Sequence, residues 1–298
     1  MTTEATLPLL ADAPSQPAKR TSLARGMRRH MIGVLSGGVI ITLVVIALFA
    51  PWIAPHSPTA QNGAPIEDPS AEHLLGTDRL GRDVLSRTIY GARVSLGVAV
   101  VAVMIGTALG VAAGLASGYA GGSSDRINQL LLEIGLAFPG IVALLAIVAA
   151  VGPSLRVATL AIAVTSVPAV MRVVRGSVIK EKESLYVEAA QALGATNFRI
   201  VVRHILPNIA AVIIVLVSAG VPVAVLTEAS LSFLGFGARP PTASWGGDLS
   251  GDARTFFEFQ PWMAIAPGAA ISITVLAFNL LGDTLRDVLD PRMRGSRG

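Results

Sequence analysis

The sequence contains no cysteine, and only 14% of its 298 residues are charged. The absence of cysteine excludes disulfide bridges and thiolate metal sites. An average soluble domain carries about 25% charged residues, so this chain has too little charge to cover a water-facing surface. The four histidines are too few and too scattered along the sequence to suggest a metal cluster. Nucleic acid is not expected as a partner, because the basic residues are not interleaved with exposed aromatic residues.

Apolar residues make up 52% of the chain, and they gather in long windows. A helix needs roughly 20 apolar residues to cross the hydrocarbon core of a bilayer. Windows of about this size with almost no charge occur at residues 31–50, 95–117, 130–151, 157–174, 209–229 and 263–282. The sequence therefore predicts an all-α integral membrane protein with six transmembrane helices and both termini on the same side.

The distribution of lysine and arginine predicts which side that is. Basic residues concentrate on the cytoplasmic side of membrane proteins. With the N-terminus inside, 16 of the 23 basic residues fall in inside segments. We therefore expect cytoplasmic termini and three parts: residues 1–30 as a disordered basic cytoplasmic tail, residues 31–93 as the first span plus an external segment with an amphipathic helix, and residues 94–298 as a core of five spans.

Glycine recurs at every fourth residue of the second predicted span, at Gly106, Gly110, Gly114 and Gly118. Small residues at this spacing let two helix backbones approach closely in lipid. We expect this stripe to pack against another helix. Proline falls inside four predicted spans, at Pro139, Pro168, Pro222 and Pro267, where it removes a backbone hydrogen bond and kinks a helix.

Charge within the predicted spans is sparse. Glu133 and Glu228 lie near span ends, where a carboxylate is expected to reach water. A carrier driven by an ion gradient would be expected to place ionisable groups in the middle of its spans. The pattern therefore weighs against a secondary transporter. It also weighs against an intramembrane enzyme, since no catalytic set of side chains is found in the predicted spans.

The longest inside loop, residues 172–206, is predicted to be folded. Ser184 caps a helix over 185–193, and Gly194 follows at the position where a left-handed residue ends a helix. Thr196 then caps a second helix over 197–205. Pro207 fits the first turn of the fifth span.

The spacing in this loop resembles the EAA loop of ABC-importer permeases. The residues that carry the resemblance are Glu188, Ala189, Ala190, Gly194, Leu206 and Pro207. The family pattern has isoleucine two residues before the Leu-Pro pair, where this chain has His204. Residues 75–96, 231–246 and 279–292 further resemble the C-type permease subunit of the dipeptide, oligopeptide and nickel importers. The similarity covers roughly residues 31–294.

This resemblance implies a type I ABC-importer permease in the bacterial inner membrane, translocating peptides. No phosphate-binding loop is present, so ATP and magnesium are expected on two separate ATP-binding subunits, with no cofactor and no enzymatic activity on this chain. A homologous permease and an extracytoplasmic binding protein are the other implied partners. Glu188 would anchor the loop to the ATPase, Ala189 and Ala190 would permit close approach, and Gly194 would make the turn. Nickel or another small solute, an ion-gradient-driven transporter and a non-transport scaffold remain alternatives.

Two external stretches carry weaker predictions. Residues 80–92 form an amphipathic pattern that suits a helix in the outer interface, with Asp83 and Arg87 as an i,i+4 pair. The aromatic residues of 232–262, Trp245 among them, indicate either an interface-seeking loop or a contact with the external binding protein.

Overall fold

The computed structural model describes residues 20–289 of the chain, and its regular elements there are helices. The long helices are α1 (Arg20–Leu48), α3 (Val84–Ala120), α6 (Leu155–Lys182), α10 (Ala210–Phe233) and α13 (Trp262–Leu289), with α4 (Gly122–Ala137) and α5 (Gly140–Val151) of intermediate length. The short ones are α2 (Ala50–Ile53), α7 (Leu185–Ala192), α8 (Asn197–Ile200), the π-helical turn η1 (Val201–Ile205), α9 (Leu206–Asn208), α11 (Trp245–Asp248) and α12 (Asp252–Thr255).

Five of these helices are long and apolar enough to cross a membrane, and the bent pair α4 and α5 makes up to six. The predicted third span is therefore not one straight helix, because the chain turns by 90° between Ala137 and Gly140. Phe138 is extended there, with ψ of 136°. A residue that precedes proline is pushed out of the helical region by the proline ring, which explains the break. Pro139 thus lies between two helices, whereas Pro168, Pro222 and Pro267 lie inside α6, α10 and α13.

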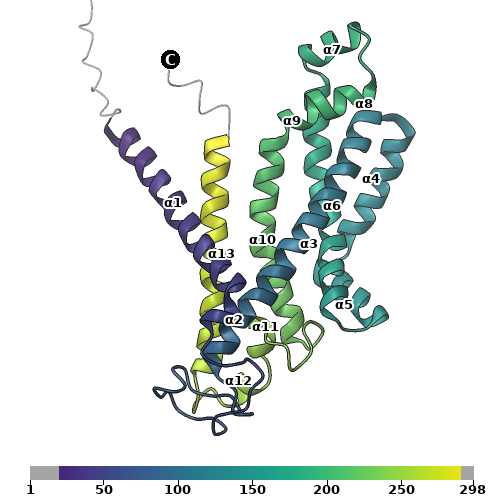
Figure 1. Cartoon of the computed structure of the whole chain (residues 1–298). Helices are drawn as coiled ribbons and strands as arrows, with labels where there is room; N and C mark the ends of the chain where they lie inside the picture. Colours follow the sequence, from purple (N-terminus) through teal and green to yellow (C-terminus); the bar gives the residue numbers. More distant parts are fainter. Residues whose placement is uncertain (1–19, 290–298) are drawn as a thin grey trace, which may run out of the picture.

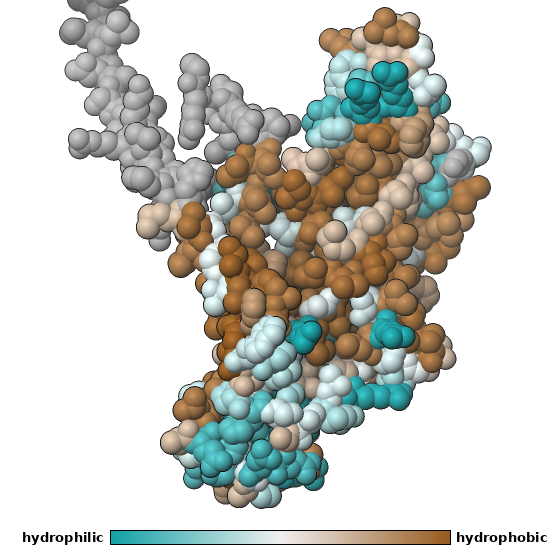
Figure 2. Space-filling model, viewed as in Figure 1, coloured by the Kyte–Doolittle hydropathy of each residue, from teal (hydrophilic) through white to brown (hydrophobic). Residues whose placement is uncertain are grey.

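The helices stand side by side, and the two ends of the bundle differ (Figure 1). The first described turn of α1, the end of α13 and the short helix α7 all lie toward the same end of the bundle. At the opposite end, residues 54–83 and 234–261 form what we call the loop layer, which contains α11 and α12. Figure 2 shows a hydrophobic band over the spanning helices and a hydrophilic surface over the loop layer.

Two sequence-based expectations about the flanks of the first span are corrected. Residues 20–30 are the first turns of α1, so the disordered tail is wrong for them, and residues 1–19 lie outside the described range. The amphipathic pattern at 80–92 does not form a separate interfacial helix. From Val84 onward it is the start of α3, which runs on without a break into the span.

The core of the bundle forms where α3 packs against α6. A Cβ added at Gly110 would lie 2.6 Å from Val170, and one added at Gly114 would lie 2.8 Å from Val174. Gly118 stands in the same relation to Val178, and Gly106 to Ser166. The glycine stripe of α3 therefore meets a row on α6 that also repeats every four residues, and the two backbones approach closely along four turns.

Candidate functional site

The helical segment predicted between the fourth and fifth spans is present, and we call α7 and α8 together the α7–α8 segment. α7 begins after Ser184 and ends before a turn in which Gly194 has φ of +78°. The Thr196 hydroxyl accepts a hydrogen bond from the Arg199 backbone N–H at 3.4 Å and so caps α8. Ser184 does not cap through its side chain, because its hydroxyl instead donates to the Glu181 carbonyl.

One face of the α7–α8 segment is anchored to the bundle. Val187, Ile200 and Ile205 are fully buried, and they form a hydrophobic cluster with Val174 and Val178 of α6. Two polar contacts strengthen this base. The Tyr119 hydroxyl lies 2.9 Å from Asn197 Oδ1, and the Lys182 ammonium donates to the Tyr119 carbonyl at 2.7 Å. The first contact ties the segment to the end of α3, and the second ties the ends of α3 and α6 to each other.

The opposite face of the α7–α8 segment is apolar and exposed. Leu185 is 81% exposed, Leu193 88% and Phe198 79%. Hydrophobic atoms accordingly cover the tip of the molecule at α7 in Figure 2. A contiguous apolar patch at the end of a rigid projection is typical of a protein contact surface.

The residues of the EAA pattern divide between these two faces. Glu188, Ala189 and Gly194 are exposed, whereas Ala190 is buried against the base of the segment. Leu206 and Pro207 lie in α9, which joins the segment to α10 through a break at Ile209. Four of the six positions are therefore exposed, Pro207 being the fourth, and Leu206 and Pro207 connect the exposed helix to a span.

A hydrogen bond near the base of α7 holds that helix to the end of α6. The Tyr186 hydroxyl donates to Glu181 Oε2 at 2.6 Å. Partial burial and the neighbouring Glu181 carboxylate together raise the pKa of Tyr186, so the phenol stays protonated and remains a donor. The sequence pattern did not single out this contact.

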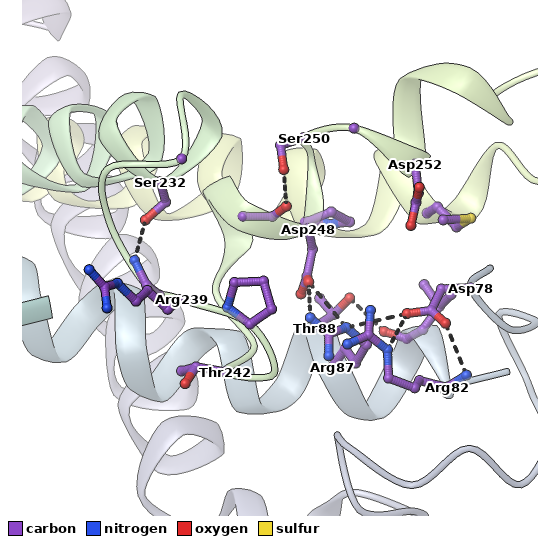
Figure 3. Close-up of a pocket in the computed structure, with 18 residues that line it drawn as sticks. Asp78, Arg82, Arg87, Thr88, Ser232, Arg239, Thr242, Asp248, Ser250 and Asp252 are labelled. Carbon is purple, nitrogen blue, oxygen red and sulfur yellow. Dashed lines mark hydrogen bonds and ion pairs between the residues drawn. The ribbon is translucent and has the colours of Figure 1, made fainter. Parts of the chain in front are cut away.

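The other end of the molecule contains a cavity of about 270 Å³ in the loop layer, lined by side chains from α3 and from both loops (Figure 3). Arg87 of α3 forms its centre. The Arg87 guanidinium binds Asp248 of α11 and donates to the Pro58 carbonyl at 3.0 Å. Arg82 pairs with Asp78 at 2.6 Å. The expected Asp83–Arg87 ion pair is thus wrong, because Asp83 caps α3 instead by accepting from the Ser86 N–H.

Long-range contacts join residues 234–261 of this layer both to the other loop and to α3. Arg79 pairs with Asp252 at 3.0 Å, and Trp245 donates from its indole nitrogen to the Thr88 carbonyl at 2.9 Å. Trp245 is only 1% exposed, so it is a core residue and not an interface-seeking one. Burial raises the pKa of Asp248, and the Arg87 guanidinium opposes that shift.

Two further groups differ from expectation. Glu228 in α10 does not reach water: it is fully buried, and its carboxylate accepts a hydrogen bond from the Ser232 hydroxyl at 2.7 Å.

The histidines are not all scattered along the folded chain, because the folding of residues 54–83 brings His56 and His73 together beside Asp83. Sequence spacing could not show this, since the three residues are 17 and 10 positions apart in an irregular part of the chain.

A band of apolar helices long enough to cross a bilayer, with a polar loop layer at one end and an exposed helix at the other, is the architecture of a multi-span membrane protein. Residues 106–295 match the family described as the binding-protein-dependent transport system inner membrane component. Residues 22–69 match the N-terminal transmembrane domain of oligopeptide transport permease C. The chain belongs to this family as a C-type permease subunit of an ABC importer, and it is a multi-pass protein of the inner membrane.

Curated relatives extend over most of the chain. It is 42% identical over 275 residues to the glutathione transport system permease protein GsiD of Escherichia coli O1:K1, covering 91% of this chain and 90% of the relative. It is 44% identical over the same length to the protein of that name from Shigella flexneri serotype 5b. Similarity of this extent includes both the α7–α8 segment and the loop layer.

Proposed function

We propose that this permease imports short peptides, with glutathione and related peptides as the first candidates, and that ATP hydrolysis on separate subunits drives it. The named transport role of the relatives and the match to oligopeptide transport permease C support this substrate class. Nickel or another small solute remains the alternative within the same architecture. The chain itself then contributes the pathway and not the chemistry.

The observation that carries the proposal is the form of the α7–α8 segment. Its buried base packs against α3 and α6, while Leu185, Leu193 and Phe198 present an uncovered apolar tip. An ATP-binding subunit that receives this tip would bury it and would push on α7 when it closes around ATP. Because α9 joins the segment to α10, the push would reach a span directly. Glu188 would add an electrostatic anchor beside the apolar contact.

The full assembly in this proposal contains two ATP-binding subunits, a homologous permease and an extracytoplasmic binding protein. The exposed apolar residues of α4 and α5, such as Leu130 and Val142, offer surface for lipid or the second permease. The end with α7 faces the cytoplasm, together with both termini. The loop layer then faces the binding protein, and the cavity around Arg87 lies on that side.

The coupling role is tested by Gly194→Val in the assembled transporter. Gly194 has φ of +78°, and a left-handed residue with a side chain costs about 1–2 kcal/mol. We expect uptake of labelled peptide into proteoliposomes to fall at least about fivefold, since strain of this size lowers the equilibrium constant for the native turn by about 5–30-fold. ATP hydrolysis that no longer depends on substrate and binding protein would accompany the loss.

Gly176→Val in α6 is the matched control. Gly176 lies near the same end of the molecule, no atom would contact its added Cβ, and its backbone is helical. Its uptake should match that of the unchanged protein. Equal uptake by the Gly194 and Gly176 variants would contradict the coupling role, and uptake that follows an ion gradient without ATP would identify a secondary transporter instead.

The substrate class is tested separately on the binding protein of the same system. Calorimetric titration with glutathione, di- and tripeptides and Ni²⁺ should show heat of binding for the peptides. Binding of Ni²⁺ alone would overturn the peptide assignment and would leave the coupling role intact.

A further inference from the structure

Two of the four histidines meet in the loop layer, beside the N-terminus of α3. His73 Nδ1 lies 3.1 Å from Asp83 Oδ1, and His56 Nδ1 lies 4.0 Å from Asp83 Oδ2. The centroids of the two imidazole rings are 4.8 Å apart. One nitrogen from each ring and one carboxylate oxygen all lie within 4.8 Å of one another. Three donors of the kinds that bind transition metals therefore converge.

One ring nitrogen of His56, Nδ1, has no hydrogen-bond partner within the described part of the chain. His56 Nδ1 is buried and makes no hydrogen bond. Its own backbone N–H donates to the Ser86 hydroxyl at 3.0 Å, which fixes the residue next to α3. Buried polar atoms are nearly always hydrogen-bonded or bound to an ion, so an orphan nitrogen beside a second imidazole and a carboxylate indicates a missing partner.

The other two side chains are buried and held in place. His73 is 2% exposed and Asp83 is 2% exposed. The two oxygens of Asp83 have separate tasks: Oδ2 accepts the Ser86 N–H at 2.7 Å as the cap of α3, and Oδ1 faces His73. A Cβ added at Gly63 would lie 2.8 Å from His73 Nε2, so only glycine leaves room for this ring. The carboxylate can thus give one oxygen to a ligand without releasing the helix.

We propose that His56, His73 and Asp83 bind one divalent transition-metal ion, and that Zn²⁺ suits the set best. Two imidazole nitrogens and a carboxylate oxygen are ordinary zinc ligands, and three protein ligands leave the fourth position to water. Donors of a tetrahedral zinc ion lie about 3.4 Å apart. His73 Nδ1 and Asp83 Oδ1 are already 3.1 Å apart, whereas the His56 donor lies within 4.8 Å of the other two and would move closer to them when the ion binds. Magnesium and calcium prefer all-oxygen ligands and are disfavoured.

Such an ion would join three separate parts of the chain. His56 follows α2, His73 belongs to the irregular stretch before α3, and Asp83 caps α3 itself. Zinc would therefore fasten residues 54–76 to the start of a span, on the surface that holds the Arg87 cavity. The ion would have a structural role, holding these parts of the chain together, and it would take no part in the proposed peptide import.

The test uses the full-length chain in lipid nanodiscs, purified through a tag that contains no histidine. After loading with Zn²⁺ and dialysis, elemental analysis should find one zinc per chain, and X-ray absorption at the zinc edge should show two imidazole ligands. His56→Gln should weaken zinc binding at least about tenfold, since loss of even an outer-shell partner costs about 10–100-fold. Zinc should also raise the unfolding temperature of the unchanged protein but not of this variant.

The matched control is His204→Gln, which removes a histidine at the opposite end of the molecule. It should bind zinc as the unchanged protein does. Asp83→Asn gives a second test, because asparagine still caps a helix but is a poorer metal ligand, and it should weaken zinc binding as His56→Gln does. Any one of three results would overturn the site. These are a protein that retains no zinc, equal zinc affinity in the His56 and His204 variants, and an absorption spectrum without two imidazole ligands. None of these measurements depends on transport.

Discussion

At the scale of single residues, the contact between α3 and α6 depends on the absence of side chains. Each glycine of the α3 stripe faces a residue of α6 at a distance that leaves no room for a methyl group. Gly97 lies on the same helix but faces open space. The four-residue spacing distinguishes the stripe from Gly97 in the sequence, and the structure shows what stands opposite each kind of glycine.

We predict that Gly114→Ala destabilises the protein by about 1–3 kcal/mol, because the new methyl group would lie 2.8 Å from Val174 and 3.0 Å from the Met171 carbonyl. Thermal or denaturant unfolding in detergent micelles measures the change. Val174→Ala in the same chain should recover part of the loss.

Gly97→Ala serves as the control, since alanine in an open helical position is about 0.5–1 kcal/mol better than glycine. It should leave stability unchanged or raise it. An equal loss at positions 97 and 114 would mean that close approach of the helices is not the cause.

At the scale of elements, the sharpest feature is the 90° turn between α4 and α5. Its position follows from a local rule, because proline at 139 disfavours a helical Phe138. Packing also contributes, since Gly135 of α4 lies against Pro168 of α6, where an added Cβ would be 2.8 Å from the proline ring. The two causes make different predictions when the proline is removed.

If the proline enforces the turn, Pro139→Ala should let α4 and α5 straighten toward one helix, since alanine has the highest helix propensity. Spin labels on Ile127→Cys and Ala149→Cys report the distance by pulsed electron resonance, and both positions are exposed. The chain has no other cysteine to label. We expect a longer mean distance; an unchanged distribution would assign the turn to packing against α6.

The positions of the helices were easier to predict from the sequence than the contacts between residues far apart in the chain. Hydrophobic windows located the five long apolar helices but not the break in the third window, and the spacing of Ser184, Gly194 and Thr196 located α7 and α8, because both signals are local in sequence. The ion pair of Arg87 was assigned to the wrong partner, since Asp83 is four residues away whereas Asp248 is reached only through the folded loop layer. The burial of Trp245 and the meeting of His56 with His73 escaped prediction for the same reason.

At the scale of the whole molecule, the two ends present opposite surfaces. The end at α7 carries a small apolar tip, and the loop layer carries paired charges around a cavity. Opposed surfaces of this kind suit a protein that receives one partner on each side of a membrane. The assignment of sides rests on the distribution of lysine and arginine.

We predict that Glu258→Cys reacts with a membrane-impermeant maleimide in intact cells and that Ala189→Cys reacts only after the cells are opened. Both positions are exposed on this chain, so in cells that make the permease without its partner subunits the side of the membrane decides the outcome. Gel-shift detection of the label measures it. Labelling of position 189 in intact cells would reverse the proposed orientation.

The ion pair between Arg87 and Asp248 also constrains how the protein is made. Its partners are 161 residues apart, and at 5–20 residues per second a ribosome needs about 8–30 s to go from one to the other. During most of that interval the partners of the Arg87 guanidinium already made, within residues 20–240, are the Pro58 carbonyl at 3.0 Å and Asp78 at 3.8 Å. These two contacts can hold the guanidinium in place on the nascent chain until Asp248 arrives. A chain that loses its last helices would therefore expose an unfinished, charged loop layer to the proteases that survey newly inserted membrane proteins.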